Sequence, residues 1–503
     1  MEATARQAIA DSILVAIRDI AHDLGRSGGW ISASEYDTAQ VLRLAPPEDD
    51  RAVLPALTWL LARQHSDGGF GDPFAPQLRA MVSLAVALCF HHYAARFPHL
   101  AGPCDRALAF VRHSAGYVLT DDIAIGAELI MPRLLDEAQA LGLELPKAPF
   151  AALLDLGKQR RALIAATQPG AGTTATHSWE AWGVTPDPAL IDASGGVGHS
   201  PAATAAWLHG ARDRADLLLY RQRAQAYLTR ASAATANGLP GLFPTVWPND
   251  RFEQIFSLFA MSCAGLLRHP LLRETVAPLL RDLAEQIEPH GLSFSSYFTP
   301  DGDDTATAMI LLAQAGYHVD HRLLNPFNRS EHYATWPGEM HMSLSTTVHA
   351  LHALALLGQP IDNTLAGLIR RQQPDGCWSG DKWHSSAFYT TGHAILALRE
   401  AGQLDPLRSA LRWLLSQQQP CGGWGHGTPT TIETAYSVLA LRPFADVPGV
   451  SRALRRSQYV LLRGISEPLW YSGSARWIGK TLYRHYYVDR MFELCAAWSV
   501  LTD

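Results

Sequence analysis

Three aspartates crowd the start of an apolar stretch in the segment SFSSYFTPDGDDTATAMILLAQ: Asp301, Asp303 and Asp304. A single aspartate at this place would cap a helix by accepting backbone N–H groups. Three neighbouring carboxylates repel one another, and this crowding raises the pKa of at least one of them. A carboxyl group that keeps its proton near neutral pH can start a reaction by protonating a substrate. The residue types alone favour helix capping or a metal site over this acid role.

The elements that must position these carboxylates are helices. Apolar residues recur at i, i+3, i+4 and i+7 in segments 51–64, 79–97, 304–317, 346–358 and 389–402. Strand-like alternation is almost absent, and Gly, Pro and Asp separate helices of about 12–18 residues. The sequence therefore predicts an all-α protein.

A short pattern follows three of the expected helices. It reads ARQHSDGGFGD at 62–72, RRQQPDGCWSGD at 370–381 and LSQQQPCGGWGHG at 415–427. Glycine permits a tight exit from the helix, the aromatic ring covers the helix end, and glutamine can bond orphan carbonyls. The last two copies lie about 45 residues apart, the length of a helix-pair repeat. The first copy lies far upstream, which indicates two related helical domains.

Composition excludes several classes of protein. The chain has 503 residues, is 48% hydrophobic and only 17% charged, and carries a net charge of −6. These values exclude disorder over most of its length and give no basic footprint for nucleic acid. No apolar run is long enough for an integral membrane helix. The six cysteines lack CxxC spacing, so we expect reduced thiols in a cytoplasmic protein, with no disulfide frame and no zinc site. The oligomeric state is left open.

The short pattern resembles the QW motifs of the terpene cyclase superfamily, and D-G-D-D-T-A resembles the DxDD motif of its class II members, most of all the drimenyl diphosphate synthases. Other stretches resemble the family in the same order along the chain: SEYDTAQVLRL (34–44), DDIAIGAELIMPRLL (121–135), HSPAATAAWL (199–208), FPTVWPNDRFEQIFSL (243–258), DKWHSSAFYTTGHAILAL (381–398) and WIGKTLY (477–483). The resemblance implies two α/α-barrel domains. Residues 1–24 and 260–503 would form the catalytic barrel, and residues 25–259 would form an inserted barrel.

The same resemblance implies an enzyme that bicyclises a linear prenyl diphosphate after protonating it. Asp303 would be the general acid for the terminal alkene, and Asp301 and Asp304 would hold its proton and orientation. The carbocation that follows needs a dry cavity with aromatic faces. The candidates for these faces are Phe294, Tyr297, Phe298, Trp336, Trp378, Trp383 and Tyr389.

The resemblance also assigns the diphosphate end of the substrate. Lys480 and Lys382, two of only four lysines, are the expected diphosphate ligands, with help from Arg476 and Arg484. Mg²⁺ is the expected cofactor, and the resemblance places it on Asp122 and Glu128, with Asp121 as an alternate ligand. The sequence has no D-D-x-x-D cluster, which the ionising class of terpene cyclases uses, so the diphosphate should survive the reaction.

Some positions depart from the family pattern. Gln40 stands where the family usually has Trp, and Thr347 stands where an Asn commonly helps to position the acid. His349 and His341 are possible substitutes for that Asn. Overall resemblance favours farnesyl diphosphate as substrate and drimenyl diphosphate as product. The alternative is geranylgeranyl diphosphate, which would give a bicyclic labdane, halimane or clerodane diphosphate.

Three rival classes of protein fit the residues less well. A squalene-type triterpene cyclase usually has a longer chain and a membrane-inserting helix. A protein-prenyltransferase β-subunit needs a zinc site. A helical-repeat binding module would give the three aspartates no task, and alanine there would leave its function intact.

Overall fold

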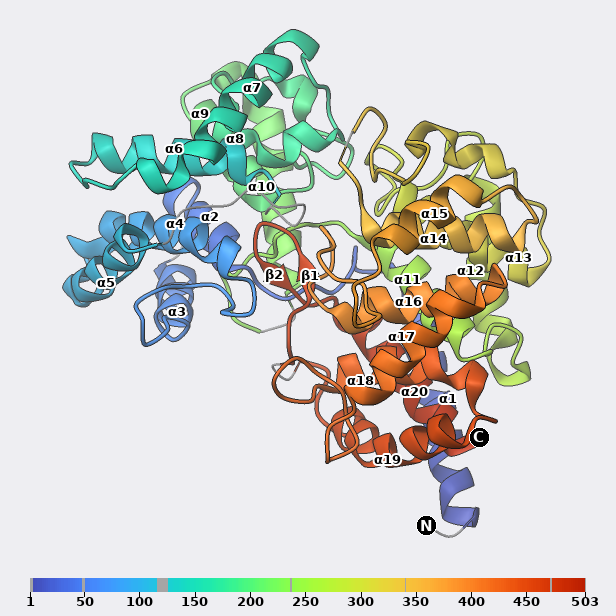
Figure 1. Ribbon diagram of the computed structural model, residues 1–503. Coiled ribbons are helices and arrows are strands. Elements are labelled where there is room, and N and C mark those ends of the chain that lie inside the picture. The colour runs from blue at the N-terminus through green and yellow to red at the C-terminus, as the bar shows by residue number, and fades with distance from the viewer. Residues whose placement is uncertain are drawn as a thin grey trace.

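The computed structural model describes residues 3–47, 50–114, 125–235, 238–339, 341–470 and 473–502. Almost all regular structure in them is helical, which confirms the prediction from the sequence (Figure 1). The one sheet in these ranges is an antiparallel ribbon of β1 (Trp477–Ile478) and β2 (Leu482–Tyr483). No helix in the same ranges is both long and apolar enough to cross a membrane.

Five inner helices of the N-terminal half pack in a closed ring, in the order α2, α4, α6, α8, α9 and back to α2. Outer helices pack against this ring: α3 on α2, α5 on α4, α7 on α6 and α10 on α9. The bounds are α2 Glu35–Leu44, α3 Asp50–Leu61, α4 Pro76–Ala94, α5 Ala101–Arg112, α6 Ala127–Ala140, α7 Ala151–Thr167, α8 Trp179–Trp182, α9 Pro201–Ala211 and α10 Leu218–Ala233, with 3-10 turns at Pro98–Leu100, Ala148–Phe150, Thr174–Ser178, Pro188–Leu190 and Ala215–Leu217.

A second ring of inner helices runs α11, α13, α14, α16, α18, α20 and back to α11, with outer helices α12, α15, α17, α19 and the N-terminal α1 around it. The bounds are α1 Ala3–Asp23, α11 Asp250–Cys263, α12 Arg273–Gln286, α13 Gly302–Ala315, α14 Leu344–Leu356, α15 Asp362–Arg370, α16 Ala387–Glu400, α17 Leu404–Ser416, α18 Thr431–Leu441, α19 Pro448–Ile465 and α20 Tyr486–Thr502, with 3-10 turns at Pro270–Leu272, His321–Phe327 and Arg442–Phe444. The fold is therefore two α/α barrels. The predicted boundary between residues 259 and 260 falls within α11, and the exact domain limits stay a prediction.

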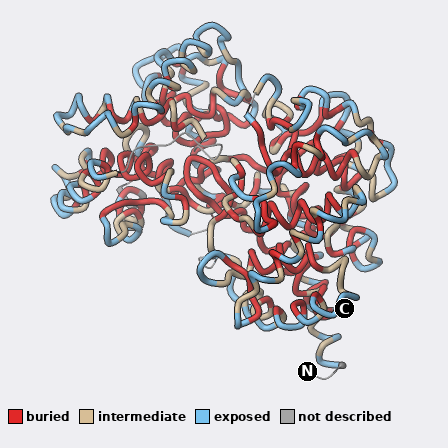
Figure 2. The backbone as a smooth tube through the Cα atoms, viewed as in Figure 1, coloured by how far each residue is buried: buried red, intermediate tan, exposed pale blue. Residues whose placement is uncertain are grey.

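The two kinds of helix differ in how far they are buried. The inner helices α13 and α14 are buried all around from Gly302 to Leu312 and from Leu344 to Leu354, because they face both the barrel interior and the outer row. The outer helix α17 buries one stripe, namely Leu407, Ala410, Trp413 and Leu414. Each leucine side chain of this stripe contributes about 1.5–3 kcal/mol when it leaves water. Figure 2 shows the result, with buried backbone inside and exposed backbone on the outer helices.

The repeated Gln-Gly-aromatic pattern ties successive helix pairs together. Gln372 Nε2 donates to the carbonyls of Gly376 and Pro406, both at 2.9 Å, so it joins its own loop to α17. The indole N–H of Trp378, and not the glutamine, bonds a carbonyl at the end of α15, that of Leu368 at 2.9 Å. The copy at 415–427 has the same bonds, with Gln418 and Trp424.

Candidate active site

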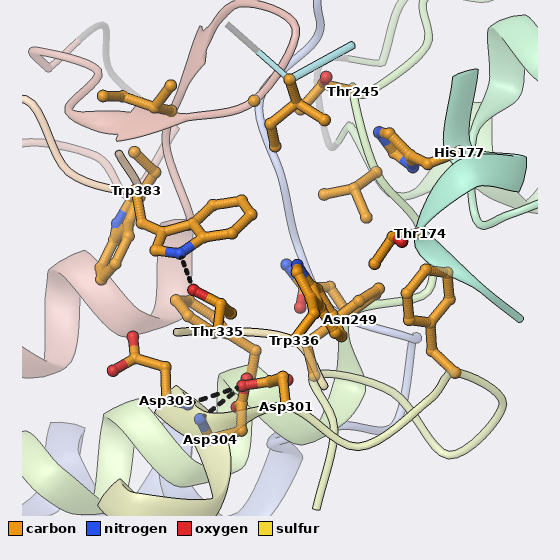
Figure 3. Close-up of a pocket in the computed structure, with 18 of the residues that line it drawn as sticks. Thr174, His177, Thr245, Asn249, Asp301, Asp303, Asp304, Thr335, Trp336 and Trp383 are labelled. Atoms are coloured by element: carbon orange, nitrogen blue, oxygen red, sulfur yellow. Dashed lines mark hydrogen bonds between the residues drawn. The ribbon is translucent and has the colours of Figure 1, made fainter. Parts of the chain in front are cut away.

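A cavity with an empty volume of about 830 Å³ lies where the two rings meet (Figure 3). Residues of both rings and of the β1–β2 ribbon form its wall: Ile125, Thr174, His177, Thr245, Val246, Asn249, Phe252, Phe294, Phe298, Asp301, Asp303, Asp304, Thr335, Trp336, Trp383, Trp477, Ile478, Gly479 and Tyr483. The three aspartates singled out in the sequence therefore share one cavity with aromatic rings.

Asp301 is the N-cap of α13. Its Oδ1 accepts the backbone N–H groups of Asp303 at 3.0 Å and Asp304 at 2.8 Å, so Asp301 caps the helix that carries the other two aspartates. Burial raises the pKa of Asp301 to about 7, and burial together with the Asp301 charge raises the pKa of Asp304 well above its usual range. Asp301 and Asp304 thus hold protons near neutral pH, and burial contributes more to this than the crowding expected from the sequence.

Asp303 begins a chain of hydrogen bonds that leads away from the cavity. Its Oδ1 lies 2.7 Å from Nδ1 of His349, and Nε2 of His349 lies 2.8 Å from Nδ1 of His393. His349 is fully buried, and the ring of Phe259 lies edge-on to both imidazoles at 5.3 and 5.0 Å. Burial lowers the pKa of His393 well below its usual value, so this residue stays neutral.

Thr347, which stands where the family commonly has Asn, forms hydrogen bonds to backbone groups. The Thr347 hydroxyl donates to the carbonyl of Ser343 at 2.6 Å and accepts the N–H of Tyr333 at 3.0 Å, so it serves the backbone. Of the two substitutes considered, His349 contacts Asp303, whereas His341 is exposed and lies beside Arg160.

Four of the predicted aromatic residues line the cavity: Phe294, Phe298, Trp336 and Trp383. Trp383 is fixed by its indole N–H, which donates to Thr335 Oγ1 at 2.6 Å. The structure does not bring the other three to the wall. The indole of Trp378 closes the end of α15, the ring of Tyr389 stacks on His384 at 4.0 Å, and Tyr297 is 46% exposed.

Several wall residues were missed from the sequence. Phe252, Trp477 and Tyr483 add aromatic faces, and Trp477 lies edge-on to Phe252 at 4.9 Å. Thr245 and Asn249 add polar groups. All five lie in FPTVWPNDRFEQIFSL or WIGKTLY, so the family-like stretches were a signal, but spacing alone does not say which side chains face inward.

His177 is the one imidazole among the wall residues, and it was also missed. Its Nδ1 lies 2.8 Å from the carbonyl of Gly198; a carbonyl only accepts, so Nδ1 carries the proton and Nε2 is free to accept one. This approach needs glycine, since a Cβ at Gly198 would lie 2.3 Å from the carbonyl carbon of Thr176. Burial lowers the pKa of His177 well below its usual value. Figure 3 shows His177 across the cavity from Asp303.

The expected diphosphate ligands are already paired, and none of them is a wall residue. Lys480 is fully buried, and its Nζ donates to Glu180 Oε1 and Ser200 Oγ, both at 2.7 Å. Lys382 pairs with Glu339. Arg476 lies 3.2 Å from Glu433, and Arg484 lies 3.0 Å from Asp489. Their direct neighbours Trp383, Trp477 and Gly479 do line the cavity.

The structure describes only one of the two expected metal ligands, Glu128. Asp122 and its alternate Asp121 lie outside the described residues. Glu128 lies in the first turn of α6, and burial raises its pKa, although the charges of Arg160 and Lys382 act in the opposite direction. Among the residues that the structure describes, no three Asp, Glu, His or Cys side chains gather as a metal site. The placed residues thus do not by themselves make a Mg²⁺ site.

Known proteins resemble this chain over nearly its full length. The squalene-hopene cyclase C-terminal domain family matches residues 342–442. The chain is 39% identical to the (+)-kolavenyl diphosphate synthase of Herpetosiphon aurantiacus, over 98% of both chains. It is 30% identical to the type B diterpene cyclase of Mycobacterium tuberculosis, over 91% of this chain and 93% of that one. The solved ent-copalyl diphosphate synthase from Streptomyces platensis is 28% identical, with a TM-score of 0.79, over 98% of this chain and 99% of that one.

Proposed function

The chain belongs to the class II terpene cyclases, and we propose that it cyclises geranylgeranyl diphosphate to a bicyclic labdane, halimane or clerodane diphosphate. The similarity to (+)-kolavenyl diphosphate synthase, 39% over 98% of the chain, carries this proposal. The similarity to a type B diterpene cyclase supports it as well. These relatives favour the twenty-carbon alternative over the farnesyl and drimenyl diphosphates that were expected first.

Asp303 is proposed as the acid that begins the reaction. It lines an aromatic cavity, and its second carboxyl oxygen is held by His349. Transfer of its proton to the terminal alkene leaves a tertiary carbocation on the substrate and a carboxylate on Asp303. Successive attack by the neighbouring double bonds closes two rings and moves the positive charge along the substrate, away from the protonated end. The faces of Phe252, Phe294, Phe298, Trp336, Trp383 and Trp477 are suited to stabilise that charge.

His177 is proposed as the group that ends the reaction. The bicyclic cation must lose a proton to leave as an alkene, and a neutral imidazole with a free Nε2 can accept that proton. His177 meets this need because burial keeps it uncharged and Gly198 holds its other nitrogen. Its place across the cavity from Asp303 separates the base from the acid (Figure 3).

We propose that the diphosphate binds at the basic residues whose direct neighbours line the cavity. Lys480, Lys382 and Arg476 are the candidate ligands. To bind the diphosphate, each cation would have to contact it together with its present carboxylate partner, or separate from that partner. Bound Mg²⁺ would offset the negative charge of the diphosphate, and Glu128 and Asp122 are the candidate ligands. Because the chain lacks a D-D-x-x-D cluster, the product should keep its diphosphate.

Incubation with geranylgeranyl or farnesyl diphosphate, followed by phosphatase and mass spectrometry, tests this function. The expected result is a bicyclic twenty-carbon alcohol after phosphatase, with no inorganic pyrophosphate released before it. Turnover of farnesyl diphosphate alone would refute the proposed chain length. Release of pyrophosphate in step with turnover would refute the retained diphosphate.

A further inference from the structure

Three buried polar side chains form a chain across the boundary between the rings. His199, in the segment before α9, has its Nε2 2.7 Å from Oγ of Ser295, in the loop that leads to α13. Its Nδ1 lies 3.1 Å from Oδ2 of Asp192, an ion-pair distance without hydrogen-bond alignment. His199, Ser295 and Asp192 are 0%, 2% and 7% exposed. Burial of three polar groups in one line calls for a role beyond packing.

Within this chain, the contact between His199 and Ser295 is a hydrogen bond between Nε2 and the hydroxyl. Nδ1 of His199 faces Asp192 at ion-pair distance. The Ser295 oxygen also accepts the N–H of Tyr297 at 3.3 Å. Asp192 is oriented in turn by the N–H of Ser194, at 2.8 Å from its Oδ1. Asp192, His199 and Ser295 form a set that we call the Asp192–His199–Ser295 unit.

This unit holds a loop that builds the aromatic wall. Ser295 stands between Phe294 and Phe298, which both line the cavity. The imidazole of His199 lies edge-on to their rings, at 5.6 and 5.2 Å. The two rings lie 4.7 Å apart, and Phe298 lies 5.5 Å from Trp336. A shift of Ser295 would therefore move two wall rings at once.

An order of Asp, His and Ser is also found in hydrolases, where the serine attacks a substrate. That role does not fit here. Ser295 is not a wall residue, is 2% exposed, and its hydroxyl is already hydrogen-bonded to His199 and to a backbone N–H. The unit is suited to fix a position, not to react.

We propose that the Asp192–His199–Ser295 unit is a positioning device that sets product specificity, because it fixes where Phe294 and Phe298 stand against the carbocation. A cation is stabilised where a ring face is near, so the ring positions decide which carbon carries the charge when the proton leaves. The inference rests on the proposed cyclase chemistry and adds its specificity-determining residues. His199 and Asp192 come from the N-terminal ring, whereas the acid comes from the other ring.

Single substitutions at the two ends of the contact test the proposal. Ser295→Ala removes the hydroxyl, and His199→Asn shortens the side chain while suiting the backbone, which has φ of 55° there. Both should give new cyclic or acyclic products beside the wild-type product, with kcat lowered by up to about 10²-fold. The double variant should be no worse than the poorer single variant, since both remove one contact.

Two further variants keep the result interpretable. Ser293→Ala is the matched control, because its hydroxyl is buried in the same loop and has no hydrogen-bond partner in the described structure. It should leave the product ratio unchanged. Ser295→Thr keeps a hydroxyl and should restore most of the wild-type ratio if Ser295→Ala folds poorly.

Products are measured on whichever prenyl diphosphate the wild type cyclises, so a wrong substrate assignment does not affect this test. An unchanged product ratio and kcat/KM in folded Ser295→Ala and His199→Asn would overturn the proposal. An equal change in Ser293→Ala would do the same.

Discussion

Nδ1 of His349 lies 2.7 Å from Oδ1 of Asp303. An acid that donates from its Oδ2 must receive a hydrogen bond at Oδ1, so His349 must carry its proton on Nδ1. Nε2 of His349 then has to accept, and His393, 2.8 Å away and kept neutral by burial, is placed to donate to it. A second histidine thereby fixes the tautomer of the first.

Loss of the acid should abolish the reaction and spare the fold. We expect Asp303→Asn, which has the same shape, to lower kcat at least 10²-fold, because general acid catalysis contributes about 10²–10⁴-fold. Asp303→Glu should also lose about 10²-fold through a misplaced proton. Asp216→Asn on the surface is the control. Wild-type turnover by a folded Asp303→Asn protein would refute the assignment.

The tautomer argument predicts a graded series at His393. His393→Phe removes the donor to His349 and should lower kcat by about 10-fold or more with little change in KM. His393→Asn keeps an N–H donor and should recover part of kcat. His352→Phe is the control, since His352 is a buried histidine on the same helix as His349 and no hydrogen bond joins it to Asp303 in the described structure. Equal losses in the Phe and Asn variants at His393 would contradict this role.

The carboxyl cluster should make stability depend on pH in a stated direction. The folded pKa of Asp301 is raised from 3.8 to about 7, so its contribution to stability is full below pH 3.8 and is lost as pH rises through 7. Asp301→Asn keeps an N-cap acceptor and removes this titration. The wild-type Tm minus the variant Tm should therefore fall between pH 4 and pH 8. A difference that grows with pH would show that the sign is wrong.

Lys480 should matter for stability as well as for substrate. Lys480→Met leaves the buried Glu180 side chain without its cation, which costs about 3–5 kcal/mol and lowers Tm by roughly 3–5 °C. Adding Glu180→Gln should recover much of the Tm. A KM for the prenyl diphosphate that stays high in this double variant would identify Lys480 as a ligand too. Lys147→Met, on the surface, should change stability by less than about 1 kcal/mol. An undiminished Tm in Lys480→Met would contradict the ion pair.

Glu128 should couple turnover to Mg²⁺. Glu128→Gln keeps the side-chain shape and should raise the Mg²⁺ concentration needed for half-maximal rate, with Tm nearly unchanged. Asp136→Asn, an exposed carboxylate on the same helix, is the control. Calorimetric titration of each variant with Mg²⁺ in the presence of inorganic pyrophosphate gives a readout apart from activity. Unchanged Mg²⁺ dependence in Glu128→Gln would place the metal elsewhere.

Local patterns predicted well what depends on neighbouring residues in the chain. The capping position of Asp301 and the bond of Gln372 to Gly376 within its own loop follow from sequence because these partners lie a few residues away. The second bond of Gln372, to Pro406, joins residues 34 positions apart and was not predicted. The cavity brings together His177, Phe252 and Trp477 from three distant segments. Their spacing in the sequence does not indicate that they lie close together. Trp378 was predicted for the wall on residue type alone, whereas its indole N–H is used at the end of α15. A side chain's direction depends on tertiary packing, which the sequence does not state locally.

The first and last helices of the chain lie side by side. Helix α1 packs along α20, and Arg6 donates to the carbonyl of Val500 at 2.9 Å (Figure 1). Arg6 and Val500 are 494 residues apart in the sequence. At a synthesis rate of ~5–20 residues per second, α20 is therefore made about 25–100 s after α1. During that interval Ile13, Leu14 and Ile17, all buried in the finished protein, have no partner in α20. The apolar face of α1 is therefore without this cover until α20 has been synthesised.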